Sequence, residues 1–447
     1  MTTPVSDMWG NDLSGTRGSV AVIGLGYIGL PTAVVLAHNG WDVTGVDVRP
    51  EILASVAAGE LPFFEEGLAD LLRAAVDAGR LRAVSEIPSA QRYVIAVPTP
   101  MTPAHEAELA AVRAVFEQVA GVLKGGETVI LESTSPTGTT REMAELVARL
   151  RPDLVVDGLV EAGLVDGGVG AAAGGTEPVY VAYAPERVLP GRIVAELHTN
   201  DRIVGGLSGK AAERAAALYR SFCRGEVLTT TAPTAELVKL SENAFRDVNI
   251  AFANELSLIA DAEGVDVYEL IRLANRHPRV KILQPGPGVG GHCIAIDPWF
   301  IVQRNPELAR LIRTAREVND SKPHWVVDKL GAALGRFVGS GLSPHVALLG
   351  LTFKPDVDDV RQSPALEIAR LAARRFPGAN FVAIDPHVRA LPADLEAAQN
   401  VALEVDAAKV RGADVVVFLV AHREFAALRE AIGPDTEVLD VTGMWHS

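Results

Sequence analysis

Cysteine is scarce in this sequence, since only Cys223 and Cys293 occur among its 447 residues. Two cysteines are too few for a disulfide scaffold, and they suit a reducing compartment in which a thiol stays available for chemistry. Positive charge is also in short supply: 41 Lys and Arg stand against 56 Asp and Glu, which gives a formal net charge of −15. This balance argues against a general affinity for nucleic acid or for an anionic membrane surface.

Long hydrophobic runs are missing as well. The apolar run Val415–Ala421 is far shorter than a membrane span. Residues 1–18 lack the basic segment and apolar stretch of a signal peptide and are expected to form a flexible tail. With 48% hydrophobic and 22% charged residues, the composition is that of a soluble globular protein. We therefore expect a cytoplasmic protein with no membrane partner.

Apolar segments that alternate with helix-like segments begin at Ser19. Strands are expected at Val20–Ile23, Val43–Asp47, Tyr93–Val97, Thr128–Leu131 and Tyr180–Tyr183. Strands that alternate with helices predict a parallel sheet covered on both faces. The stretch Gly163–Gly175, rich in Gly and Ala, is expected to be a surface loop.

A long helix is predicted from about Thr231–Thr234 to Glu263–Gly264. Its apolar residues recur at three- and four-residue steps and share one face; they are Leu237, Leu240, Ala244, Val248, Phe252, Leu256 and Ile259. Such a helix spans domains or forms a subunit interface, or else it is a core helix of one monomer.

The alternation restarts after Pro344, with strands expected at Val346–Gly350, Phe381–Asp385, Asp414–Val420 and Val438–Asp440. The predicted fold class is α/β, with two Rossmann-like doubly wound domains joined by a long central helix and a helical middle domain. The expected boundaries are 1–18 for the tail, 19–205 for the first Rossmann domain, 206–322 for the helical domain and 323–447 for the second Rossmann-like domain.

A glycine fingerprint, Gly24-Leu25-Gly26-Tyr27-Ile28-Gly29, lies between an expected strand and an expected helix. In this context Gly24 permits a tight turn, Gly26 lets the backbone approach a pyrophosphate, and Gly29 lets the helix pack on its strand. Asp47 ends the second strand, where a carboxylate accepts hydrogen bonds from an adenosine ribose. The pattern predicts NAD rather than NADP, although Arg49 lies nearby.

A second glycine-rich loop, residues 286–293, ends in Cys293. Its glycines, among them Gly286, Gly288 and Gly290, suggest backbone that approaches a ligand closely. If a helix begins after Cys293, the helix field favours the nucleophilic thiolate, and Asp297 lies four residues further on. A buried, inert cysteine is the alternative.

Several polar residues are placed as active-site residues would be. Lys239 and Asn243 are four apart and share a face of the long helix, as a solvated polar stripe would too. Glu186 and the segment Glu132-Ser133-Thr134 follow expected strands. None of the 10 histidines shows a metal-ligand spacing, so we expect no metal.

Together these features resemble the UDP-sugar 6-dehydrogenases of the UDP-glucose/GDP-mannose dehydrogenase family, and among them the branch that oxidises UDP-N-acetyl-D-mannosamine. The resemblance extends from Ser19 to the end of the sequence. The most specific stretches are Asn243–Asn249, Arg276–Val280, Gln284–Trp299, Phe353-Lys354-Pro355 and Arg361–Pro364.

The resemblance implies a role for each matching residue. Cys293 corresponds to the nucleophile, and the other implied catalytic residues are Lys239, Asn243, Asp297, Glu186 and Thr134. Implied cofactor contacts are Gly24, Gly26, Tyr27, Ile28, Gly29, Asp47, Val97, Pro98, Thr99, Thr134 and Arg361. Implied substrate contacts are Glu186, Arg187, Val188, Leu189, Lys239, Asn243, Gly286, Gly288, Gly290 and Lys354, with Arg279 reaching the substrate of a neighbouring subunit.

The implied reaction is an NAD-dependent four-electron oxidation of the C6 alcohol of a UDP-sugar to a carboxylate, through a thiohemiacetal and a thioester on cysteine. The implied assembly is a homodimer or a dimer of dimers. Pro190 stands where UDP-glucose enzymes carry a second acidic residue, which favours an acetamido sugar. UDP-N-acetylglucosamine and UDP-glucose stay open as substrates, as do a two-electron hydroxy-acid dehydrogenase and a protein that only senses NAD or a nucleotide.

Overall fold

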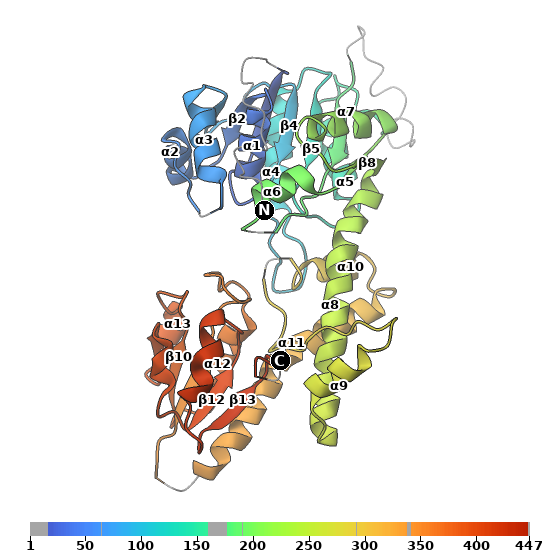
Figure 1. The fold of residues 1–447 in the computed structure, drawn as a ribbon. Helices are drawn as coiled ribbons and strands as arrows, with labels where there is room; N and C mark the ends of the chain where they lie inside the picture. Colours follow the sequence, from blue (N-terminus) through green and yellow to red (C-terminus); the bar gives the residue numbers. More distant parts are fainter. Residues whose placement is uncertain are drawn as a thin grey trace. The chain divides into compact units, whose positions relative to one another are not determined.

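The computed structural model describes residues 17–63, 65–159, 177–189, 191–291, 293–337 and 341–445. Most of the expected tail, the Gly/Ala-rich stretch 163–175 and Pro190 lie outside these residues. The chain divides into two units, Met1–Leu240 and Ser241–Ser447 (Figure 1). In the described part of the chain, no helix is long and apolar enough to cross a membrane.

The first unit is built on an eight-stranded sheet in the order β3-β2-β1-β4-β5-β6-β7-β8. Neighbouring strands are parallel except β6 and β7, which are antiparallel. The strands are β1 (Ser19–Ile23), β2 (Asp42–Val46), β3 (Leu81–Val84), β4 (Arg92–Ile95), β5 (Thr128–Leu131), β6 (Tyr180–Tyr183), β7 (Arg202–Gly206) and β8 (Val227–Thr231). The strand order reverses between β1 and β4, and ligands of open α/β sheets bind at the carboxyl ends of the strands beside such a reversal.

Helices cover both faces of this sheet. One apolar core contains residues of α1 (Gly29–His38), α2 (Pro50–Ala57), α3 (Leu68–Asp77), α6 (Ile193–Thr199) and α7 (Gly209–Tyr219). The other contains residues of α4 (Ala110–Val122), α5 (Thr139–Leu150) and the start of α8 (Ala232–Glu263). The central strands are buried on both sides, which explains their nearly continuous apolar sequences.

The second unit begins within α8 and combines a helical region with a parallel sheet. Its helices are α9 (Val267–Ala274), α10 (Asp297–Arg304), α11 (Arg310–Leu334), α12 (Pro364–Arg375) and α13 (Ala393–Glu396). The strands β9 (His345–Leu349), β10 (Asn380–Ile384), β11 (Val401–Glu404), β12 (Val415–Phe418) and β13 (Glu437–Asp440) form a sheet in the order β11-β10-β9-β12-β13. Helices α11 and α12 pack on one face of it, and the 3₁₀ segments Ala407–Val410 and Arg423–Glu430 pack on the other.

The predicted fold class is confirmed, with two parallel α/β sheets and a helical middle region. The long helix is found at Ala232–Glu263, close to its predicted limits. Its seven apolar residues do not share one environment, however. Leu240 and Ala244 are buried, whereas Leu237, Phe252 and Ile259 are exposed in the single chain.

Candidate active site

The glycine turn after β1 has the conformation that a dinucleotide phosphate requires. Gly24 has a φ of +93°, and a Cβ there would lie 2.6 Å from the carbonyl oxygen of Ala96. A Cβ on Gly29, the first residue of α1, would lie 1.8 Å from the Gly24 oxygen. Around Gly26, by contrast, nothing lies within 4 Å of a Cβ position. The turn is therefore closed toward its own sheet and open at Gly26, beside the N-terminus of α1, and the predicted contact of Gly26 with a pyrophosphate stays a prediction.

The two residues between Gly26 and Gly29 flank this turn. Tyr27 is partly exposed and stacks on Phe63, with 4.2 Å between the ring centroids. Ile28 is the residue that precedes the first turn of α1. Their predicted contacts with the cofactor stay predictions.

Asp47 directly follows β2 and is buried. Its Oδ2 accepts a hydrogen bond from the backbone N–H of Leu25 (2.9 Å), and Arg49 donates through Nε to Oδ1 (3.1 Å) and through Nη2 to Oδ2 (3.0 Å). Burial raises the pKa of Asp47, but the hydrogen bonds from Arg49 and Leu25 outweigh it and lower the pKa. Asp47 thus holds the guanidinium of Arg49 through both carboxylate oxygens, so Arg49 is not poised for a 2′-phosphate.

The loops after β4 and β5 are joined by side-chain hydrogen bonds. Thr99 donates from its hydroxyl to the carbonyl oxygen of Thr134 (2.7 Å), and Ser133 donates to that of Val97 (2.7 Å). These bonds bring together Val97, Pro98, Thr99 and Thr134, all predicted near the cofactor. They lie at the carboxyl ends of β4 and β5, beside the strand reversal.

Glu186 follows β6 and is held by a buried arginine that the sequence did not point out. Arg202, the first residue of β7, donates from Nη2 to Oε2 of Glu186 (2.6 Å), and their side chains are 5% and 8% exposed. The backbone N–H of Arg187 donates to Oε1 (2.6 Å). Both carboxylate oxygens are therefore fixed in orientation.

Glu132, at the end of β5, lies in the same buried cluster. It accepts a hydrogen bond from the hydroxyl of Tyr219 (2.7 Å). Burial raises the pKa of Glu132 to about 7, against the charge of Arg202 and together with that of Glu186. Arg202 and Tyr219 were missed in the sequence, whereas Glu132 was noted there only for its position after an expected strand and was given no role.

The remaining residues of the segment after Glu186 lie closer to solvent. Arg187 donates from Nη1 to the carbonyl oxygen of Asp201 (3.0 Å), and Leu189 donates from its backbone to Glu196 (2.9 Å). Val188 is half-buried and Leu189 exposed. Their predicted contact with substrate stays a prediction.

In the second unit, Asn243 and Asp297 form a short buried contact. The side-chain amide of Asn243, on α8, donates to Oδ2 of Asp297, the first residue of α10, over 2.6 Å. Cys293 is exposed and begins the turn that leads into α10, since its carbonyl oxygen accepts the backbone N–H of Asp297 (2.8 Å). Lys239, one helical turn before Asn243 on α8, is also buried. The predicted nucleophile thus occupies the turn that the Asn243–Asp297 contact anchors.

The glycine loop before Cys293 is tied to α8 and α11 by two amides missed in the sequence. Asn254 accepts the backbone N–H of Gly286 at Oδ1 (2.9 Å) and donates to Oδ1 of Asn319 (2.8 Å). Gly288 has a φ of +144°, and a Cβ on Gly290 would lie 2.4 Å from the carbonyl oxygen of Gln362. Only glycine fits this approach of the loop to the segment after β9.

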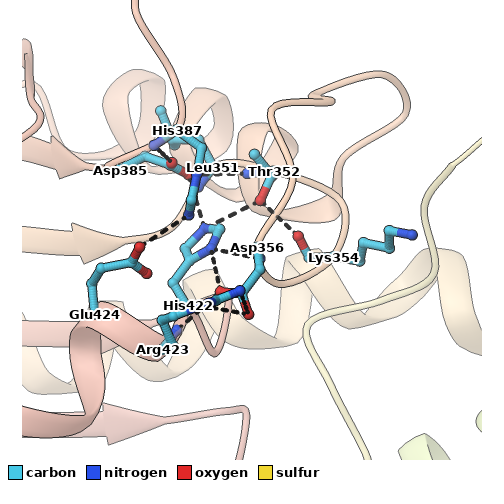
Figure 2. A network of polar contacts seen from close by, with 9 residues as sticks. All are labelled: Leu351, Thr352, Lys354, Asp356, Asp385, His387, His422, Arg423 and Glu424. Carbon is cyan, nitrogen blue, oxygen red and sulfur yellow. Dashed lines mark hydrogen bonds and ion pairs between the residues drawn. The ribbon is translucent and has the colours of Figure 1, made fainter. Parts of the chain in front are cut away.

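That segment carries Lys354 and Arg361. Lys354 is half-buried, and its carbonyl oxygen accepts a hydrogen bond from Thr352 (2.9 Å), while its side chain extends away from this turn (Figure 2). Arg361 pairs with Asp359 (2.7 Å). Arg279 is exposed beyond α9. For these three residues the structure gives a position, and their predicted ligands stay predictions.

Comparison with known proteins covers almost the whole chain. The UDP-glucose/GDP-mannose dehydrogenase family matches through its NAD binding domain at residues 18–223, its central domain at 233–321 and its UDP binding domain at 347–447. UDP-N-acetyl-D-mannosamine dehydrogenase of Salmonella typhi is 48% identical over 432 residues, which cover 96% of this chain and 99% of the relative. NDP-N-acetyl-D-galactosaminuronic acid dehydrogenase of Ralstonia nicotianae is 48% identical over 429 residues, 96% of each chain.

Solved structures agree with the sequence comparison. The structure of UDP-D-ManNAc dehydrogenase from Pyrococcus horikoshii superimposes with a TM-score of 0.81 at 38% identity and covers 95% of this chain and 96% of its own. The chain therefore belongs to the UDP-glucose/GDP-mannose dehydrogenase family and is an NAD-dependent nucleotide-sugar dehydrogenase.

Proposed function

We propose that this enzyme oxidises the C6 alcohol of UDP-N-acetyl-D-mannosamine to the carboxylate. The substrate is supported by relatives of that name at 47–48% identity over 96% of the chain. The observation that carries the chemistry is the turn of Cys293, which leads into α10 and is anchored by the buried Asn243–Asp297 contact. An exposed thiol on a fixed turn has the access and orientation that a nucleophile needs.

The residues divide the reaction between them. NAD, when bound, accepts hydride from the carbon that is oxidised. The thiolate of Cys293 adds to the aldehyde carbon and gives a thiohemiacetal, whose carbon again carries a hydrogen; this hydrogen leaves as hydride to a second NAD while the hydroxyl group loses its proton. The resulting thioester is cleaved by water, which releases the carboxylate and restores the thiol. Lys239 and Asn243 stabilise the negative oxygen that forms in these steps.

Glu186 acts in hydrolysis of the thioester, through a water molecule that its carboxylate orients. Support comes from its place at the end of β6 and from the two donors, Arg202 and the backbone of Arg187, that fix both oxygens. A carboxylate held by two donors in this way is ordered, which suits a residue that orients a water. Thr134, joined to the loop of Thr99, lies beside the reacting carbon in this proposal.

In this proposal NAD binds to residues 19–205 and the UDP-sugar binds to residues 323–447. Residues 206–322 supply the catalytic Lys239 and Cys293 and form the subunit contact. We propose a homodimer or a dimer of dimers, because Phe245, Phe252 and Ile259 lie exposed at seven-residue spacing along α8. Arg279 then serves a partner's substrate. A fully active monomer in light scattering would contradict this.

A cytoplasmic location suits the need for both NAD and a nucleotide sugar.

A second substrate has support of its own. The relative named NDP-N-acetyl-D-galactosaminuronic acid dehydrogenase is as similar as the mannosamine enzyme. Substrates that differ only in the sugar ring make the same contacts through their UDP part. The choice among mannosamine, galactosamine, glucosamine and glucose substrates therefore depends on contacts of the sugar ring alone.

The experiment is an NADH-release assay with purified enzyme on a panel of nucleotide sugars: the UDP conjugates of N-acetylmannosamine, N-acetylgalactosamine, N-acetylglucosamine and glucose, and GDP-mannose. We expect the highest kcat/KM with UDP-N-acetyl-D-mannosamine. A higher value with any other sugar would replace the proposed substrate, and a flat absorbance trace with all five would contradict the enzymatic function itself.

A further inference from the structure

His422 is a fully buried histidine at the carboxyl end of β12, and both of its ring nitrogens are engaged. Nδ1 accepts a hydrogen bond from the backbone N–H of Asp356 (3.0 Å). Nε2 lies 3.2 Å from Oδ2 of Asp385 and 3.2 Å from the hydroxyl of Thr352 (Figure 2). Since the Thr352 hydroxyl donates to the carbonyl oxygen of Lys354, the Nε2 proton of His422 is the donor in these contacts. The ring is thus held as one tautomer, with an acceptor at Nδ1 and a donor at Nε2.

Asp385 repeats the arrangement of Asp47 in the first unit. Asp47 follows β2 and accepts from Leu25, the residue after Gly24, whereas Asp385 follows β10 and accepts from Leu351, the residue after Gly350 (2.6 Å). Each carboxylate also accepts the backbone N–H of the residue two positions on, 3.0 Å at Arg49 and 2.8 Å at His387. In the second unit a histidine ring occupies the carboxylate, whereas in the first the guanidinium of Arg49 does. Asp385 is therefore used within the protein.

The contacts of His422 and Asp385 hold the turn Leu351–Asp356 in place. Asp356 has a φ of +59°, in the left-handed region that residues other than glycine rarely adopt. Its backbone N–H is satisfied by His422, and its carboxylate accepts hydrogen bonds from the backbone (3.1 Å) and the Nε (3.2 Å) of Arg423. Strained backbone of this kind persists only where the surroundings fix it, and such positions gather at ligand-binding sites.

We propose that His422 is a positioning residue, which holds the turn Leu351–Asp356 in the conformation that presents Lys354 to the nucleotide sugar. The inference rests on the proposed contact of Lys354 with that substrate. His422 itself contacts the backbone of Asp356 and the side chains of Thr352 and Asp385, and it acts on the substrate only through the turn. In Figure 2 the Lys354 carbonyl faces the network, and the Lys354 ammonium extends away from it.

Proximity alone would also suit a metal ion. Asp356, His387, His422 and Glu424 each bring a possible ligand atom within 4.8 Å of the others. The lone pair of Nδ1 on His422 already accepts the Asp356 N–H, and a metal would have to displace this bond. The arrangement therefore favours positioning, and zinc binding becomes an outcome of the test.

The first experiment needs no ligand. Hydrogen exchange is measured on the full-length wild-type enzyme and on His422→Ala, over peptides that cover Leu351–Asp356. We expect faster exchange at these amides in the variant, with exchange in β1 and β5 unchanged. Unchanged exchange in the turn would overturn the proposal, whatever the substrate is.

The second experiment measures the affinity for UDP-N-acetyl-D-mannosamine by calorimetry. His422→Ala and Lys354→Ala should each weaken binding about tenfold or more, the size expected for one lost hydrogen bond to a charged group. Because both changes act on one contact, the double variant should bind no more weakly than the poorer single variant. Additive losses, or no loss in His422→Ala, would overturn the proposal. A wild-type enzyme that binds no nucleotide sugar would refute the proposed function instead, and the exchange result would still decide whether His422 holds the turn.

Two conservative variants separate positioning from a general loss of structure. The side chain of Asn matches the acceptor at Nδ1, and that of Gln matches the donor at Nε2. We expect His422→Asn and His422→Gln each to recover part of the affinity, while NAD affinity stays at the wild-type value in all variants. His387→Ala is the matched control, a neighbouring histidine outside the turn, and should bind substrate normally. Stoichiometric zinc binding that both His387→Ala and His422→Ala abolish would overturn the proposal in favour of a metal site.

Discussion

Arg202 and Glu186 form an ion pair of 2.6 Å with almost no solvent around either side chain. Glu132 also has a buried carboxyl group, and its charge raises the pKa of the same guanidinium. One cation therefore serves two acids at the ends of neighbouring strands. The pair does not simply stabilise the fold, because burying both charges costs much of what their attraction returns. Its consequence is that Glu186 has one orientation.

Removal of Arg202 tests this relationship. In Arg202→Met the buried charge of Glu186 loses its partner, and breaking such a pair costs about 3–5 kcal/mol in free energy of unfolding. The double variant Arg202→Met/Glu186→Gln should be more stable than Arg202→Met alone, because no unpaired charge remains. Urea denaturation of the wild type and of both single and double variants measures the coupling. If Arg202→Met lowers the free energy of unfolding by the same amount in the wild-type enzyme and in Glu186→Gln, the pair carries no coupling energy.

Glu132 should make stability depend on pH in a defined window. Its pKa is raised from the ordinary value of 4.5 to about 7 in the folded enzyme, so the folded state holds a proton that the unfolded chain has released. The contribution of Glu132 to stability is then fully present below about pH 4.5 and is lost as pH rises to about 7, by about 1.4 kcal/mol per unit.

The measurement compares wild-type enzyme with Glu132→Gln by denaturation between about pH 5 and 8. The amide stays neutral and keeps an acceptor for the Tyr219 hydroxyl. As pH rises, we expect the free energy of unfolding of Glu132→Gln to increase relative to that of the wild-type enzyme. A difference that is constant with pH would mean that Glu132 ionises normally.

Asp47 should set the cofactor preference through Arg49 as well as through its own charge. In Asp47→Ala the guanidinium of Arg49 loses both side-chain hydrogen bonds and becomes available to a 2′-phosphate. The ratio of kcat/KM for NAD to that for NADP should therefore fall by about tenfold or more. Asp47→Ala/Arg49→Ala is the control and should lose NAD activity without gaining any with NADP. A wild-type enzyme that turns over NADP as well as NAD would refute the assignment.

The sequence predicted the elements that are bounded by glycine or proline and buried throughout. Thr128–Leu131 and Tyr180–Tyr183 are strands with the predicted limits, and the long helix ends beside Gly264. Strands β8 and β11, which lie at sheet edges and have no fully buried residue, were missed. The interior strand β7 was missed as well, whereas the edge strand β13 was predicted, so an edge position alone does not decide the outcome.

The sequence predicted those site residues that can be recognised from their own position in the chain. Glu186 stands at the end of a strand, and Cys293 ends a loop of glycines. Arg202, Asn254 and His422 gave no such signal, since each is recognised only by a partner at least 16 residues away. Pairings of this kind come from the fold, because a single sequence contains nothing that links the two positions.

The most direct test of the account is the number of NADH formed for each sugar acid. The aldehyde offers a second hydride only after it forms a tetrahedral adduct, which in this account is the adduct with the thiol of Cys293, so the wild-type enzyme should give two NADH for each carboxylate. In Cys293→Ala the carboxylate should fall by several orders of magnitude, as is usual when a nucleophile is removed, while NAD binding persists. NADH is measured by absorbance, the sugar acid by mass spectrometry, and NAD titration shows that the variant is folded. Near-normal carboxylate formation by Cys293→Ala would contradict the covalent mechanism, and one NADH for each product in the wild type would contradict four-electron oxidation.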